Sequence, residues 1–196
     1  GAPGAPGALT APDRETIMGE LWRWPATDLA SAIRDGAISS REAVADCLAR
    51  IHAVNPVLNA LVEVHEAQAL AAADAADAAV ARGEVLAPLH GVPLTVKVNV
   101  DQAGCATTNG IVAFKDLIAA EDSPVVANLR RAGAVILGRT NTPAFSFRWF
   151  TDNALHGRTL NPWSKAHTPG GSSGGASAAV ASGMGPIAHG NDLAGS

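Results

Sequence analysis

The stretch SPVVANLRRAGAVILG, residues 123–138, indicates the fold class more clearly than any other part of the chain. Ser123 followed by Pro124 is typical of a helix that begins with a cap and a proline at its first position. Gly133 ends this helix, and residues 134–138 form a short, continuously apolar strand. A helix, a glycine and a buried strand in succession are typical of an α/β domain.

The flanking residues continue this alternation of helices and strands. Ser39 and Glu42 have the spacing of a capping box, which predicts the start of an amphipathic helix that ends at Asn55–Pro56. We expect Cys47 to be a small buried residue of this helix. The other expected elements are helices over residues 28–34, 67–82 and 176–181 and strands over residues 58–64, 92–98 and 187–189.

The composition excludes several classes of protein. The 196 residues carry 14 Lys+Arg and 18 Asp+Glu, and 47% of them are apolar. This balance argues against an intrinsically disordered chain and against a nucleic-acid partner, because a cation excess is absent. Two cysteines cannot staple a chain of this length, so we expect reduced thiols and a cytoplasmic protein. No apolar run reaches the length of a membrane span, so no membrane partner is expected.

The first residues read GAPGAPGALTAP and lack the pattern of a signal peptide. We interpret residues 1–27 as a flexible N-terminal tail and lead-in. Cys105 follows a glycine in a loop and has no obvious partner. The six histidines show no close zinc-ligand spacing, and the sequence predicts no metal site. Phe145, Phe147 and Trp149 are interpreted either as packing residues or as the lining of a substrate pocket.

Lys97 is the first of three places where the sequence indicates chemistry. It lies between Val96 and Val98 in a strand that is expected to be covered on both faces. Burial lowers the pKa of a lysine, and a neutral amine can serve as a general base near neutral pH. The alternative is a solvated lysine on an edge strand, and Lys97 taken alone favours this alternative.

The second place is TPGGSSGG, residues 168–175. Its glycines allow a sharp turn and place Ser172 and Ser173 directly before a helix. A phosphate-binding P-loop would need a Gly-Lys-Ser/Thr ending, which this segment lacks. A plain helix cap by one of the serines is the other interpretation.

The third place is GNDLAGS, residues 190–196. A strand end followed by small residues and a serine can expose successive backbone N–H groups. Such groups form an oxyanion hole beside a nucleophile. The alternative is an ordinary turn, which this segment taken alone favours.

In combination, these segments resemble the amidase signature family. The motifs GVPLTVK at 91–97, GRTNTP at 138–143, NPW at 161–163, GGSSGG at 170–175 and GNDLAGS at 190–196 occur in the order of that family. The resemblance spans residues 29–196. It implies an α/β fold with a mixed β-sheet sandwiched between helices, of which this chain holds only the N-terminal part.

The resemblance implies a Ser–cis-Ser–Lys triad that hydrolyses a carboxamide through an acyl-serine intermediate. Lys97 matches the family lysine, Ser172 the bridging serine that follows a cis peptide after Gly171, and Ser196 the nucleophile. Ser173 and Gly171 match supporting positions. The oxyanion loop, acting through backbone N–H groups, is matched by Leu193, Ala194, Gly195 and Ser196. The resemblance implies no cofactor and no metal ion.

The chain also departs from the family pattern. Val98 stands where the family often has Asp, and Asn191 and Ala194 replace a common Thr and Gly. The resulting GND-x-AGS form is similar to that of amidases acting on small or cyclic amides, such as 6-aminohexanoate cyclic-dimer hydrolases. This form favours a stand-alone hydrolase of a small-molecule amide.

Two other hypotheses stay open. One is the A-type subunit of a glutamine-dependent tRNA amidotransferase, and the other is an inactive fragment or assembly piece. Family chains continue well beyond the nucleophile. We therefore interpret residues 28–196 as the N-terminal portion of one domain, whose missing C-terminal part is an expected partner alongside a homo-oligomer.

Overall fold

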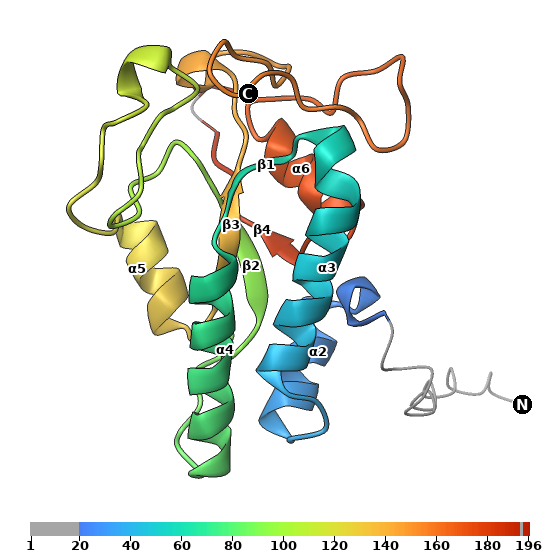
Figure 1. Ribbon diagram of the computed structural model, residues 1–196, viewed down its shortest axis with the longest axis vertical. Helices are drawn as coiled ribbons and strands as arrows, with labels where there is room; N and C mark the ends of the chain where they lie inside the picture. Colours follow the sequence, from blue (N-terminus) through green and yellow to red (C-terminus); the bar gives the residue numbers. More distant parts are fainter. Residues whose placement is uncertain (1–19, 193) are drawn as a thin grey trace, which may run out of the picture.

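The structure is a computed structural model that describes residues 20–192 and 194–196. A four-stranded mixed sheet forms its centre (Figure 1). The strand order is β1-β3-β2-β4. β2 pairs in parallel with β3 and β4, whereas β1 pairs antiparallel with β3. The α/β class with a mixed sheet is thereby confirmed. The strands are β1 (Leu61–Val64), β2 (Pro93–Lys97), β3 (Val135–Thr140) and β4 (Ile187–Ala188).

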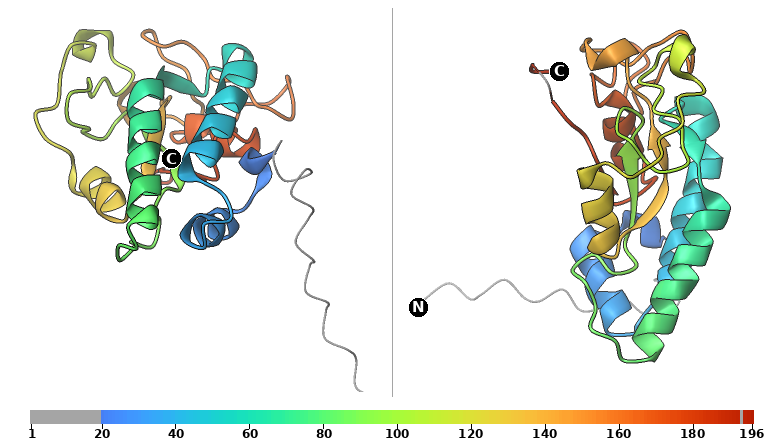
Figure 2. Two further views of the ribbon diagram at one scale, coloured as in Figure 1. Left: turned by 60° about the horizontal axis from the view of Figure 1, so that its bottom comes forward. Right: turned by 90° about the vertical axis from the view of Figure 1, so that its left-hand side faces the viewer.

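Helices cover both faces of this sheet, as the right-hand view of Figure 2 shows for α5 and for the pair α3 and α4. Val135 and Leu137 pack into a core with α3, α4 and α6, whereas Ile136 packs with Val126 of α5. Side chains alternate along a strand, so neighbouring residues reach opposite cores. The helices are α2 (Ala26–Arg34), α3 (Ser40–Leu58), α4 (Glu66–Ala81), α5 (Pro124–Arg131) and α6 (Gly174–Ala181), with 3-10 turns η1 (Leu21–Arg23), η2 (Val112–Phe114) and η3 (Ala144–Ser146).

The same alternation positions Lys97. Leu94 and Val96 share the α5 core, so Thr95 and Lys97 point to the opposite face, toward α6. β2 is an interior strand and all its residues are buried. The edge-strand interpretation of Lys97 is therefore wrong. None of the helices in the described ranges is long and apolar enough to cross a membrane.

The end of α3 differs from the prediction. The capping box of Ser39 and Glu42 is present, but the helix passes through Pro56 and ends at Leu58. The ring of Pro56 lies on the exposed side of the last turns, where water can solvate the carbonyl that loses its partner. Asn59 takes the left-handed conformation at φ 52° and ends the helix, with its N–H bonded to the Asn55 carbonyl.

The predicted tail also needs correction in its described part. Residues 1–19 lie outside the described residues, but residues 20–27 already belong to the packed structure. Leu21 is buried with Leu29 and Ile33 of α2, and the Trp22 N–H donates to Asp46 Oδ2 at 2.9 Å. α2 begins at Ala26, within the range assigned to the lead-in. Burial of Leu21 is the physical reason, because an apolar side chain gains by leaving water.

Gly175 allows α6 to lie directly against the start of β1 and the end of β3. A Cβ at this position would lie 2.5 Å from the backbone N and O of Asn141 and 2.8 Å from the Ala60 carbonyl oxygen. These are backbone atoms and cannot give way as a flexible side chain would. The small residue therefore sets the distance between the helix and the sheet.

We expect Gly175→Ala to lower the free energy of unfolding by about 2 kcal/mol, because overpacking exceeds the gain in helix propensity. Val180→Ala on the exposed face of α6 is the matched control, with an expected change within about 1 kcal/mol. Denaturant unfolding of both variants measures the difference. A Gly175→Ala protein as stable as the parent would contradict the close packing.

Candidate active site

Lys97 ends β2 with its side chain fully buried at 0% exposure. Its Nζ donates to three acceptors: Ser172 Oγ at 2.5 Å, Asn191 Oδ1 at 2.8 Å and Ser173 Oγ at 3.2 Å. Every one of these partners is uncharged. In the described ranges, no carboxylate lies within ion-pair distance of Nζ, so all direct contacts of the ammonium are with neutral dipoles.

This environment shifts the ionisation of the amine. Burial lowers the pKa of Lys97 from 10.5 to about 8, while the negative charge of Asp192 acts in the opposite direction. A buried ammonium loses its hydration, which disfavours the charged form. A substantial fraction of Lys97 is therefore neutral at mildly alkaline pH, and a neutral amine can accept a proton.

Ser172 reaches the lysine through the conformation of the loop before α6. The peptide bond between Gly171 and Ser172 is cis, as the family resemblance implied. A Cβ on Gly171 would lie 2.5 Å from the Arg148 carbonyl oxygen, so only glycine fits. Thr142 Oγ1 donates to the Ser172 carbonyl at 3.2 Å and fixes the residue from the β3 side. Ser172 is 1% exposed.

Ser196 completes a row of three side chains. Its Oγ donates to Ser172 Oγ at 3.2 Å and lies 3.1 Å from the Ser146 carbonyl oxygen. Ser172 Oγ in turn lies 2.5 Å from Lys97 Nζ. The three residues that the sequence singled out therefore meet, although 99 positions separate the first from the last. The loops after β2 and β3 and the C-terminal segment lie at the same end of the molecule (Figure 1).

The loop before Ser196 gathers its N–H groups around one oxygen. The N–H groups of Ala194, Gly195 and Ser196 donate to Asp192 Oδ1 at 3.0, 2.5 and 2.8 Å. Leu193, the fourth expected member of the oxyanion loop, lies outside the described residues. The backbone can thus direct three N–H groups at a single anion, and in this structure that anion is the carboxylate of Asp192.

Three polar residues of the site were missed by the sequence interpretation. Asn191 was noted only as a departure from the family, yet it binds Lys97 directly. Asn99 exchanges two hydrogen bonds with the Asn191 side chain, at 3.1 and 3.2 Å. The Ser146 carbonyl oxygen comes within 3.1 Å of Ser196 Oγ because φ is 61° at Ser146 and 56° at Phe145, which turns the chain sharply. A polar residue two positions after the predicted strand 187–189 was the available signal for Asn191; none existed for Ser146.

Exposed aromatic residues follow this turn. Phe145, Phe147 and Trp149 are 46%, 68% and 74% exposed. Within the described residues, Phe147 and Trp149 are mostly exposed, whereas Phe145 is about half buried and keeps ring contacts. Phe145 contacts Phe114 edge-to-face at a centroid distance of 5.9 Å. An apolar surface thus adjoins Ser146, and through it Ser196.

Comparison with known proteins identifies the family of this chain. The model of the family described as Amidase matches residues 42–196. The chain belongs to the amidase family. This membership accounts for the shared order of the five motifs.

Individual members of this family are also similar to the chain. The chain is 58% identical over 91% of its length to an indoleacetamide hydrolase of Bradyrhizobium diazoefficiens, covering 34% of that protein. It is 43% identical over 91% of its length to the A-type subunit of the glutamyl-tRNA(Gln) amidotransferase of Acidothermus cellulolyticus, covering 35% of that protein. The solved 6-aminohexanoate cyclic dimer hydrolase matches with a TM-score of 0.79 and 36% identity, over 88% of this chain and 34% of that one. The chain spans about a third of the length of these relatives.

If Lys97 is the base of an amide hydrolase, the function proposed below, its ionisation sets the pH dependence of that reaction. Below pH 8 the amine is increasingly protonated and cannot accept a proton, so kcat/KM should fall about tenfold per pH unit and level off above pH 8. Initial rates between pH 6 and 10 measure this profile. Lys97→Arg should abolish activity throughout the range, whereas Lys115→Arg on the surface should leave the profile unchanged. A profile that is flat from pH 6 to 9 would contradict Lys97 as the base.

Proposed function

We propose that this chain carries the catalytic residues of an amide hydrolase that converts a carboxamide and water into a carboxylic acid and ammonia or an amine. The observation that carries the proposal is the row of atoms Ser196 Oγ, Ser172 Oγ and Lys97 Nζ, with separations of 3.2 and 2.5 Å. A serine hydroxyl becomes a useful nucleophile only when a base removes its proton. The buried amine at the end of the row is suited to that task.

The hydrogen bonds around Lys97 support a neutral amine in the reactive state. A neutral amine has two protons to donate and one lone pair. Asn191 Oδ1 can only accept, and Ser173 Oγ is an acceptor because its own proton goes to the Asn191 carbonyl at 3.2 Å. These two acceptors use both protons of the amine. The lone pair is then left for the hydroxyl proton of Ser172.

The proposed reaction passes protons along this row. Ser196 Oγ attacks the amide carbonyl carbon and gives its proton to Ser172 Oγ, which releases its own proton to Lys97. The proton returns through Ser172 to the leaving nitrogen as the C–N bond breaks. Water then attacks the acyl-Ser196 ester by the same route and releases the acid.

The loop around Asp192 has a proposed role in the same step. The tetrahedral intermediate carries a negative oxygen that needs N–H donors at about 2.7–3.1 Å. The N–H groups of Gly195 and Ser196 would exchange the Asp192 carboxylate for this oxygen when substrate binds. Their present arrangement around an anion supports this role.

We further propose that the acyl group of the substrate is aromatic and small. The 58% identity to an indoleacetamide hydrolase supports this choice. The exposed rings of Phe145 and Phe147, next to Ser146 in the chain, supply apolar surface for an aryl group. Aromatic groups prefer such edge-to-face or offset contacts.

The second candidate function is that of the A-type subunit of an amidotransferase. It is favoured by the 43% identity to such a subunit of a glutamyl-tRNA(Gln) amidotransferase. In that case glutamine would be the amide, and partner proteins would receive the ammonia. Hydrolysis of an aryl acetamide without glutamine distinguishes the two functions.

Ser196→Ala, Ser172→Ala and Lys97→Ala should each lower the turnover of indole-3-acetamide by at least about 10³-fold, because each removes one member of the row. Ser31→Ala, an exposed serine of α2, is the control and should retain parental turnover. Ammonia release measures the rate, with glutamine as the competing substrate. Near-parental turnover in Ser196→Ala would refute the mechanism, and turnover of glutamine alone would favour the second candidate.

A further inference from the structure

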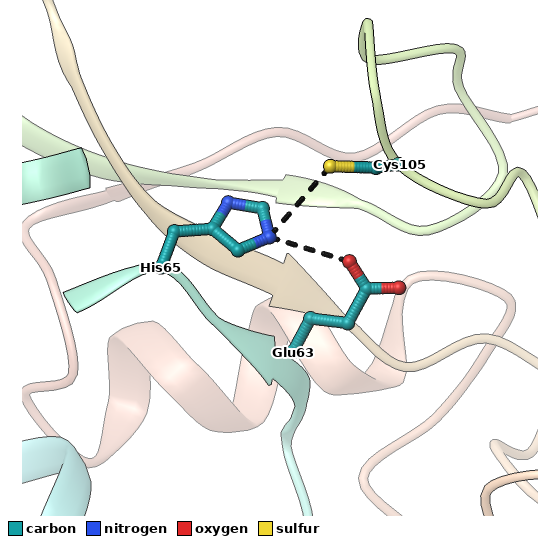
Figure 3. Close-up of side chains that lie close together, drawn as sticks. All are labelled: Glu63, His65 and Cys105. Atoms are coloured by element: carbon teal, nitrogen blue, oxygen red, sulfur yellow. Dashed lines mark hydrogen bonds and ion pairs between the residues drawn. The ribbon is translucent and has the colours of Figure 1, made fainter. Parts of the chain in front are cut away.

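A second group of reactive side chains lies apart from the Lys–Ser–Ser row. Glu63 of β1, His65 directly after it and Cys105 of the loop after β2 point toward one another (Figure 3). His65 Nε2 lies 3.3 Å from Glu63 Oε2 and 3.8 Å from Cys105 Sγ. All three ligand atoms lie within 4.8 Å of one another. The sequence interpretation gave Cys105 no partner, and its contact with His65 corrects that interpretation. The sequence also predicted no metal site, and this convergence is the reason to test that prediction.

Hydrogen bonding accounts poorly for the convergence. A single N–H at His65 Nε2 would have to serve both a carboxylate and a sulfur, at separations at or beyond the usual N–H···O range of about 2.7–3.2 Å. In the described ranges, Glu63 Oε2 and Cys105 Sγ form no other side-chain hydrogen bond. The His65–Glu63 contact is therefore a long hydrogen bond and the His65–Cys105 contact a weak one, and a single Nε2 proton cannot serve both well.

The separations fit a tetrahedral ion instead. Metal distances of about 2.0 Å to nitrogen or oxygen and about 2.3 Å to sulfur give ligand separations of about 3.3 and 3.5 Å for tetrahedral Zn²⁺. The observed separations from His65 Nε2 are 3.3 Å to Glu63 Oε2 and 3.8 Å to Cys105 Sγ. Cys105 lies on a loop, and a shift of a few tenths of an ångström would bring its Sγ to the tetrahedral separation from His65 Nε2. The third pair, Glu63 Oε2 and Cys105 Sγ, lies within 4.8 Å, and the same loop would have to bring these two atoms to about 3.5 Å when an ion binds.

The surroundings can hold these ligands in place. Gln102 Nε2 lies 3.2 Å from His65 Nδ1, while Gln102 Oε1 is buried without a hydrogen-bond partner. Rotating the Gln102 amide by half a turn lets Oε1 accept the Nδ1 proton, which leaves the Nε2 lone pair free for a metal. A histidine ligand usually donates its other ring N–H to such an oxygen. Arg139 Nη1 lies 3.5 Å from the second carboxylate oxygen of Glu63.

We propose that Glu63, His65 and Cys105 bind a divalent transition-metal ion of the zinc type, with water in the fourth position. On binding, the S–H bond of Cys105 breaks, a sulfur–metal bond forms, and the proton leaves to solvent. Because the thiol must lose its proton to bind the ion, affinity should increase with pH. All three residues are partly exposed, which gives the ion a path from solvent.

The ion would cross-link two segments that are distant in the sequence. It ties the loop after Lys97 to edge strand β1, next to Arg139, which already donates to the Val98 and Val100 carbonyls of that loop. No member of the Lys–Ser–Ser row is a ligand. Metal binding should therefore stabilise the fold, whether or not the proposed hydrolase function holds.

Cobalt titration tests the site directly. Purified protein is reduced, treated with a chelator, freed of it and titrated with Co²⁺. We expect one equivalent to produce a near-ultraviolet thiolate-to-cobalt charge-transfer band and the strong visible bands of tetrahedral Co²⁺. Zn²⁺ should remove these bands and raise the Tm.

Matched variants assign the ligands. Cys105→Ser and His65→Gln should lose the thiolate band, whereas Cys47→Ala keeps one thiol and should retain it. His52→Gln removes an exposed histidine that pairs with Glu66 at 3.3 Å, and it should also retain the band. The proposal is overturned if the parent protein gives only weak octahedral bands, or if the thiolate band persists in Cys105→Ser or depends on Cys47.

Discussion

The burial of the Lys97 amine without a carboxylate partner is the constraint on which the site depends. Removing an ammonium from water costs several kcal/mol unless it is paired or loses its proton. Among the described residues, the amine is contacted only by hydroxyl and amide oxygens, at 2.5, 2.8 and 3.2 Å. Those partners tolerate a lysine that alternates between the charged and neutral forms. A carboxylate at the same place would fix the positive charge of the amine and would prevent its proposed use as a base.

The sheet topology brings the partners to this amine. β2, β3 and β4 run in parallel, so their carboxyl ends meet at one edge. Lys97 ends β2, Thr142 and Ser146 follow β3, and Asn191 follows β4. Active sites of open α/β sheets form outside such strand ends. The close approach of α6, which Gly175 permits, then delivers Ser172 to the same edge.

Much of this arrangement could be predicted from the sequence, because it follows from the order and spacing of the motifs along the chain. The helix, glycine and strand of residues 123–138 indicated the fold class, and the motif order indicated Lys97, Ser172 and Ser196. The residue types alone predicted the end of α3 less well. Pro56 reads as a helix end, but its exposed position and the left-handed Asn59 allow two more residues of helix.

Contacts between distant loops could not be read from the sequence. Asn191 meets Lys97 only because β4 lies beside β2. Cys105 meets His65 only because the loop after β2 extends past β3 to β1, on the far side of the sheet from β4. The N–H groups around Asp192 depend on a backbone conformation that residue types alone do not specify. Each of these features brings together residues whose separation in the sequence does not indicate that they are in contact.

Labelling by a fluorophosphonate tests the central claim, the activation of Ser196 by Lys97 through Ser172, most directly. Intact-mass measurement of the purified protein should give a single adduct, which peptide mapping assigns to Ser196. The labelling rate should fall at least about 10³-fold in Lys97→Ala and in Ser172→Ala, because the hydroxyl then lacks its base. An adduct on another residue, or equal labelling rates in the parent and the Lys97→Ala protein, would contradict the account.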